Sequence, residues 1–121
     1  MTQQLDTLVY KTLRYANDCM CKGIEPSLDE IRAMSEGNEV MFSAAMEECD
    51  QKKLLNGLYI SKYLDASSQI VQGNHIRITL EGITFLKENN AMKSVAEKLT
   101  PATLSVLSNA VQRTITASMG F

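Results

Sequence analysis

The sequence predicts a mostly α-helical fold that contains one small antiparallel β-hairpin. Apolar residues recur at spacings of three and four along most of the 121 residues, which is the period of an amphipathic helix. Between residues 54 and 79 this pattern gives way to two runs of strand-forming side chains separated by a polar connection. Serine, asparagine or threonine stands before the later helical segments, where it can act as an N-cap.

The first two predicted helices are separated by a short extended link. Residues 4–21 place leucine, valine and alanine side chains on one face. The link contains Pro26, which disfavours helical backbone at the residue before it. Ser27 opens the second helix, and "SLDE" predicts a capping box between Ser27 and Glu30. Gly37 limits this helix to fewer than ten residues.

A third helix is expected to follow directly, with Asn38 as its N-cap. The predicted buried stripe consists of Phe42, Ala45, Met46 and Cys49, with Val40 and Met41 contributing at the start. Because only a short turn separates the second and third helices, they form a predicted helix-turn-helix unit.

The start of the first strand has two interpretations. If Gly57 ends the third helix, the strand begins at Leu58. If the strand begins at Leu54, it carries a bulge or turn at Asn56 and Gly57. We favour the earlier start, because strand-forming residues lie on both sides of this pair.

The second strand is predicted over residues 75–79, after a polar, turn-rich connection at residues 65–74. Its side chains alternate, so the two isoleucines face the core while His75 and Arg77 face outward. Residues 54–79 thus form a predicted hairpin with a long connection.

A fourth helix is expected to begin at the end of this strand, with Thr79 as the N-cap. Gly82 in its first turn is tolerated, and it is useful if another helix approaches closely there. The predicted buried face consists of Leu80, Ile83 and Leu86. Two asparagines at positions 89 and 90 interrupt the helix, and helical spacing then resumes to Leu99.

The last helix is predicted to span residues 101–118, because Thr100 can cap it and Pro101 suits its first position. Arg113 is its one charged residue, so we expect the helix to pack on its own domain or on a second chain. The stripe assigned to homodimerisation consists of Leu104, Leu107, Val111 and Ile115.

This order of elements is that of a winged helix-turn-helix with added C-terminal helices. Residues 1–99 form the predicted winged-helix domain, and residues 100–121 form the C-terminal packing or dimerisation helix. The segments "VMFSAAMEECDQKKLL" and "IRITLEGITFLKENNAMKSVAEKL" resemble the YjcQ family of small winged-helix proteins from low-GC Gram-positive bacteria and their phages or prophages. The resemblance runs from about Leu8 to Leu99, although Lys53 stands where the family often has glycine. It implies a DNA-binding role.

Charge is distributed unevenly along the chain, whose net charge is −2. Residues 27–50, which hold the helix-turn-helix, contain one base and seven acids. Its second helix would present Asn38, Glu39, Met41, Ser43 and Glu47 to DNA, and the acids among them repel phosphates. We therefore place the predicted DNA contacts mainly on and beside the hairpin, at Lys52, Lys53, Lys62, Gln69, Gln72, Asn74, His75 and Arg77, with Ser43 on the third helix.

Two functions remain open at this point: a DNA-binding regulator of phage or prophage type, and a protein-interaction module on the same scaffold. The acidic helix-turn-helix and the nearly uncharged last helix favour protein partners, of which a second copy is the simplest. An enzyme is not expected, because the chain has one histidine and lacks nucleophile, phosphate-loop and metal-ligand motifs.

No cofactor, metal, membrane or small-molecule partner is predicted. The three cysteines lack metal-site spacing and are expected to pack as small reduced thiols. The sequence contains neither a signal peptide nor a membrane-length apolar run, so a cytoplasmic location is expected.

Overall fold

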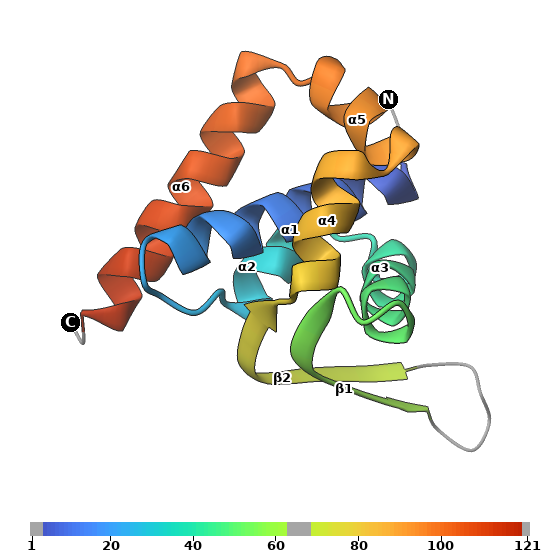
Figure 1. Cartoon of the computed structure of the whole chain (residues 1–121). Helices are drawn as coiled ribbons and strands as arrows, with labels where there is room; N and C mark the ends of the chain where they lie inside the picture. The colour runs from blue at the N-terminus through green and yellow to red at the C-terminus, as the bar shows by residue number, and fades with distance from the viewer. Residues whose placement is uncertain (1–3, 63–68, 120–121) are drawn as a thin grey trace.

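The computed structural model describes residues 4–62 and 69–119, and within them it confirms the predicted winged helix-turn-helix with added C-terminal helices (Figure 1). The elements in chain order are α1 (Leu5–Cys21), α2 (Leu28–Ala33), α3 (Glu39–Gln51), β1 (Leu55–Lys62), β2 (Gln69–Ile78), α4 (Leu80–Glu88), α5 (Asn90–Glu97) and α6 (Pro101–Ser118). The two strands form one antiparallel sheet.

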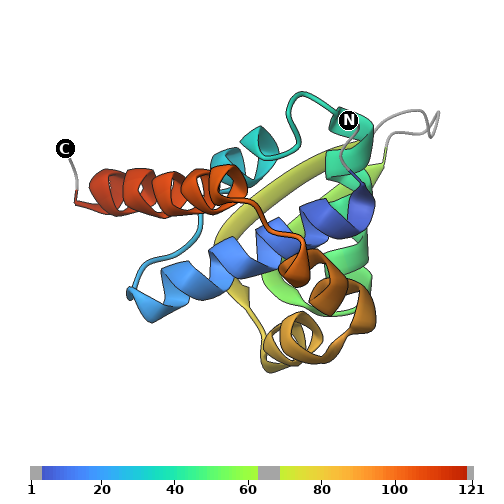
Figure 2. The same ribbon diagram turned by 90° about the horizontal axis from the view of Figure 1, so that it is seen from above.

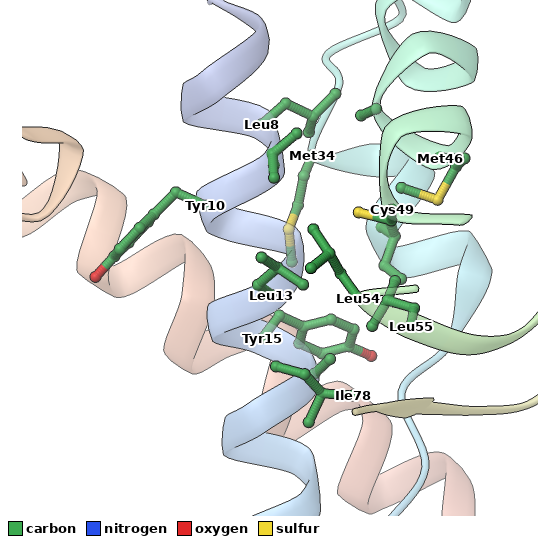
Figure 3. Close-up of a cluster of buried hydrophobic side chains, with 14 of the residues drawn as sticks. Leu8, Tyr10, Leu13, Tyr15, Met34, Met46, Cys49, Leu54, Leu55 and Ile78 are labelled. Atoms are coloured by element: carbon green, nitrogen blue, oxygen red, sulfur yellow. The ribbon is translucent and has the colours of Figure 1, made fainter. Parts of the chain in front are cut away.

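Helix α1 is the centre of the domain. It contacts α3, α4, α5, α6 and β2, and from above it lies between α6 on one side and α4 on the other (Figure 2). Leu8 and Leu13 of α1 are fully buried and point toward Met34, Cys49 and Leu54, whereas Tyr10 points to the opposite side of α1 (Figure 3). Apolar side chains are therefore buried on two sides of α1.

The predicted stripe of α3 is confirmed at all four positions, because Phe42, Ala45, Met46 and Cys49 are buried. The contribution expected from Val40 is wrong, since its side chain is 83% exposed. Val40 lies at the start of α3 on the side away from this stripe. This apolar side chain is thus exposed to solvent.

Three of the four predicted N-caps are confirmed. The side chains of Asn38, Thr79 and Thr100 accept hydrogen bonds from the backbone N–H groups three residues later, at 3.0, 2.9 and 3.2 Å. The predicted capping box of α2 is wrong, because the Ser27 side chain makes no capping hydrogen bond. Its partner Glu30 instead binds Arg113 of α6, with Nη2 to Oε1 and Nε to Oε2 distances of 2.9 Å.

Helix α6 is attached to the domain by a chain of hydrogen bonds that is largely buried. The Ser27 N–H donates to the Tyr15 hydroxyl at 2.9 Å, and the Thr114 hydroxyl donates to the Ala110 carbonyl at 2.8 Å. Because the Thr114 proton is already used, the Tyr15 hydroxyl must donate to Thr114 Oγ1, at 2.5 Å. Desolvation by burial raises the pKa of Tyr15 to about 12. One phenol thus joins α1, the start of α2 and α6.

The hairpin contains a pronounced irregularity near its base. Asn56 pairs with Arg77 and Leu58 pairs with Gly73, so Gly57 alone faces residues 74–76 of β2. This confirms the early start of β1 with a bulge, one residue after the predicted Leu54. Both strands bend at this level (Figure 1).

The predicted start of β2 at residue 75 is wrong, because the strand begins at Gln69. Residues 69–74 look like a polar loop in the sequence, but the backbone of residues 69–73 pairs with β1 from Lys62 to Leu58. Backbone pairing therefore overrides the weak strand preference of the side chains. Residues 63–68 of the predicted connection lie outside the described residues.

Two expectations for α4 are corrected. Leu80 is 80% exposed, because it stands at the first helical position while the buried face follows Gly82 and Leu86. The close neighbour of Gly82 is the backbone before β1 rather than another helix. A Cβ at this glycine would lie 2.2 Å from the Leu54 carbonyl oxygen.

Alkaline pH is expected to destabilise the fold. Desolvation by burial raises the pKa of Cys49 from 9.0 to about 12, and the pKa of Tyr15 from 10.0 to about 12. Both groups lose protons more readily when unfolded, so their contribution is complete below pH 9 and declines as the pH rises toward 12. Urea unfolding between pH 7 and 11 measures this decline. Cys49→Ala should reduce its slope, because it removes one of these two buried groups.

Candidate functional site

The solvent-facing side of α3 is acidic. Glu39 and Asp50 are exposed, and Glu47 and Glu48 are half-buried, whereas α3 itself contains no lysine or arginine. The carboxylate of Glu47 accepts a hydrogen bond from the Gln51 amide at 3.2 Å, so it already has a partner on the same helix. This face combines negative charge with the exposed Val40 side chain.

The one base of the helix-turn-helix is Arg32, and its charge is already used within the domain. Its Nη1 lies 3.3 Å from the Glu39 carboxylate. Its guanidinium lies over the ring of buried Phe42, 4.7 Å from the centroid, where the ring attracts a cation. Arg32 therefore adds little free positive charge to the surface around α2 and α3.

Two of the predicted DNA contacts, His75 and Arg77, lie at the bend of the hairpin instead of near its tip. The Nδ1 atom of His75 is 2.9 Å from a carboxylate oxygen of Glu25, in the link between α1 and α2. Arg77 lines a cavity of about 310 Å³ beside the same link, together with Met20 and Pro26. Both side chains are exposed, as the alternation of the strand predicted, while Ile76 and Ile78 are buried.

Gln72 and Asn74 lie in a different place, in a groove between α2 and the hairpin. We call it the α2–β2 groove; it has a volume of about 700 Å³ and is lined by residues 27–29 and 71–74, Arg32 and Tyr59. Tyr59 is 59% exposed. Sequence reasoning missed this groove, although the alternation of β1 could have indicated that the Tyr59 side chain faces outward.

The lysines predicted as DNA contacts also lie at different places in the structure. Lys52 follows the end of α3, pairs with Glu48 at 3.3 Å and lies 5.4 Å from the Phe85 ring centroid. Lys53 adopts a positive φ of 56° in the turn before β1. The side chains of Lys62 and Gln69 lie outside the described residues. The structure therefore does not assemble the predicted contacts into one described surface, and Ser43 lies apart on α3, half-buried.

The residues assigned to homodimerisation have different environments. Leu107 is 2% exposed and Val111 is also buried, so both belong to the inward face of α6. Leu104 is 40% exposed, and Ile115 is partly buried. Of these four, Leu104 has the most surface available to a second chain.

The described residues contain no group of three or more histidine, cysteine or acidic side chains that could hold a metal ion. Cys19 and Cys49 are buried as expected, but Cys21 is exposed, so the expectation that all three are packed is wrong. Among the helices of the described ranges 4–62 and 69–119, none is long and apolar enough to cross a membrane.

The sequence matches the family described as YjcQ protein over residues 10–101. The chain belongs to the YjcQ family. No curated protein and no solved structure matches it. The YjcQ match begins within α1 and ends at Pro101, the first residue of α6. Thr114 and Arg113, which attach α6 to α1 and α2, therefore lie beyond the part of the chain that defines this YjcQ protein as a family member.

Proposed function

We propose that this YjcQ protein is a non-enzymatic, cytoplasmic winged-helix module that binds another protein. The observation that carries the proposal is the composition of the α3 surface, because α3 contains four acids and no base and exposes the Val40 side chain. In DNA-binding helix-turn-helix proteins the second helix enters the major groove. Here that helix is α3.

The charge of α3 disfavours DNA. Each phosphate contact requires a cation or a hydrogen-bond donor, whereas Glu39, Glu47 and Asp50 bring negative charge toward the phosphates. Arg32 does not compensate, because it pairs with Glu39. An apolar side chain within a polar surface suits a protein partner better, since protein interfaces combine an apolar centre with a polar rim.

Photocrosslinking tests this proposal. A photoreactive benzoylphenylalanine in place of Val40 should form a covalent product with a polypeptide when cells that express the protein are irradiated. Leu80 is the matched control position, because its exposed fraction is 80% against 83% for Val40. The expected product is sensitive to protease, resistant to nuclease and absent for position 80. A nuclease-sensitive product from position 40, or identical products from both positions, would contradict the proposal.

A second candidate is the DNA-binding regulator of phage or prophage type that the family resemblance implied. It is favoured by the projecting hairpin (Figure 1), whose last described pair is Lys62 with Gln69. Contact through the hairpin would avoid the acidic α3. An electrophoretic shift assay with promoter and prophage fragments at low salt tests it, and Lys62→Glu should abolish the shift. The absence of a shift at micromolar protein would dispose of this candidate.

Homodimerisation through residues 101–119 remains part of the proposal, with Leu104 as its principal apolar contact. Leu104→Glu should convert the dimer to a monomer, because it introduces a charge into an apolar contact. Leu80→Glu, a similar change on α4, should leave the dimer intact. Sedimentation velocity distinguishes the two species, and a monomeric wild-type chain would refute dimerisation.

A further inference from the structure

The outer edge of β2 is open beside the α2–β2 groove. In the part of the chain that the structure describes, the sheet has two strands, so alternate residues of the regularly paired part of β2 direct both backbone N–H and C=O away from β1. Within residues 4–62 and 69–119, no backbone hydrogen bond joins β2 to an element other than β1. The link before α2 reaches this strand through a side-chain contact, from Glu25 to His75. The edge at residues 71–73, where β2 pairs regularly with β1, therefore offers unused hydrogen-bonding groups.

The α2–β2 groove is large enough to hold an additional strand. Its volume is about 700 Å³, and it includes the strand segment 71–74 and the first turn of α2. Four strand residues extend over roughly 13 Å, and a neighbouring strand lies about 4.8 Å away. Leu28 and Val71 supply apolar contacts, while Tyr59 stands at the exposed side. An extended polypeptide can thus pair with β2 and place alternate side chains against the groove.

The charged side chain of the groove lining that lacks an ion-pair partner among the described residues is an acid. Asp29 is exposed, and it makes no hydrogen bond or ion pair within the part of the chain that the structure describes. Arg32, the other charged residue of the lining, is balanced by Glu39. A basic side chain on the bound segment would therefore gain a partner in Asp29, whereas a phosphate backbone would be repelled.

We propose that the α2–β2 groove binds an extended, basic polypeptide segment of a partner protein as a third strand on the edge of β2. This inference rests on the proposed interaction function and gives it a second, specific contact site. Main-chain hydrogen bonds to residues 71–73 supply affinity, and Asp29 selects for positive charge. The occupant is distinct from whatever contacts Val40 on α3.

Nuclear magnetic resonance titration of the full chain tests the groove. The probe is an acetylated and amidated heptapeptide of alternating lysine and valine, KVKVKVK. Chemical-shift changes should centre on the backbone amides of residues 71–73, and their hydrogen exchange should slow about tenfold at saturation, as new hydrogen bonds protect them. The same peptide with every backbone nitrogen methylated should cause no such changes, because it retains the charge and loses the N–H donors.

Two matched variants test whether Asp29 selects for positive charge. Asp29→Asn should weaken KVKVKVK binding roughly fivefold, as expected for the loss of one exposed ion pair. Asp50→Asn makes the same change in net charge on α3 and should leave binding unchanged. Equal binding of the methylated peptide, no binding of either peptide, or equal effects of the two variants would overturn the groove assignment.

Two other outcomes would also overturn it. A 12-base-pair DNA duplex that shifts the same amides would identify the groove as a nucleic-acid site. Concentration-dependent shifts at residues 71–73 without peptide would identify a second copy as the occupant. Failure of the groove remains separable from failure of the proposed function, because crosslinking from Val40 reports on α3 alone.

Discussion

Tyr15→Phe is expected to lower the free energy of unfolding by about 2–3 kcal/mol while leaving the side chain almost the same size. The Tyr15 hydroxyl accepts from the Ser27 N–H and contacts Thr114 Oγ1. Its removal leaves one partly buried donor and one buried acceptor without a partner, and an unsatisfied buried group costs about 1–3 kcal/mol. Urea unfolding followed by circular dichroism measures the loss.

Tyr59→Phe is the matched control for this prediction. Tyr59 is exposed and makes no hydrogen bond within the described residues, so its change should stay within about 0.5 kcal/mol. A double-mutant cycle with Thr114→Val separates the hydrogen bond from general packing, because the two losses should be clearly non-additive. Additive losses, or a Tyr15→Phe effect as small as the control, would show that the buried hydrogen-bond chain is unimportant for stability.

Gly82→Ala is expected to destabilise the protein by about 1–3 kcal/mol, the usual cost of overpacking a core. Helix propensity alone predicts the opposite sign, since alanine is favoured over glycine by about 1 kcal/mol within helices. The added Cβ would lie 2.2 Å from the Leu54 carbonyl oxygen and 2.7 Å from Ile78 Cγ1. The same Leu54 carbonyl accepts the Thr79 N–H at 3.1 Å, so relieving the clash disturbs the junction between β2 and α4.

Ser105→Ala provides the control for the helical effect of alanine. Ser105 is an exposed residue of α6, and the change should raise stability by a few tenths of a kcal/mol at most. Thermal and urea unfolding of both variants give the comparison. A Gly82→Ala protein that is more stable than wild type would mean that the backbone before β1 moves without cost, contrary to the close approach described above.

Because α6 packs on the rest of the domain, its removal is a poor way to study this YjcQ protein. The family match ends at Pro101, yet Leu107 and Thr114 are buried against the domain, and Arg113 binds Glu30 of α2. A chain shortened to the matched region would expose the Tyr15 hydroxyl and its apolar surroundings. Point substitutions on the outer face of α6 therefore test dimerisation more cleanly than its removal.

Local features of this protein were predictable from its sequence because they depend on nearby residues. The caps at Asn38, Thr79 and Thr100 each bind a backbone group three residues away, so the residue type and its position before a helix are sufficient. The stripe of α3 follows from helical periodicity. The order of the helices and strands and the acidic character of α3 were likewise predicted from the sequence.

Only the tertiary structure determined how the candidate site is arranged. The sequence places His75 and Arg77 on the outward side of a strand, and both are exposed, but only the structure shows that they lie beside the link before α2, where His75 contacts Glu25. Backbone pairing with β1 makes a strand of residues 69–73 and so creates an edge beside α2. These features depend on contacts between residues far apart in the chain, and side-chain type alone does not specify such contacts.

The same distinction holds for Glu30 and α6. The spacing of "SLDE" indicates a capping box, but Arg113, 83 positions later, binds the carboxylate instead. Periodicity identified the apolar stripe of α6, while packing on α1 decided that Leu107 and Val111 face inward. The sequence by itself thus determined the elements and their charge, and long-range packing decided which of their faces remain available to a partner.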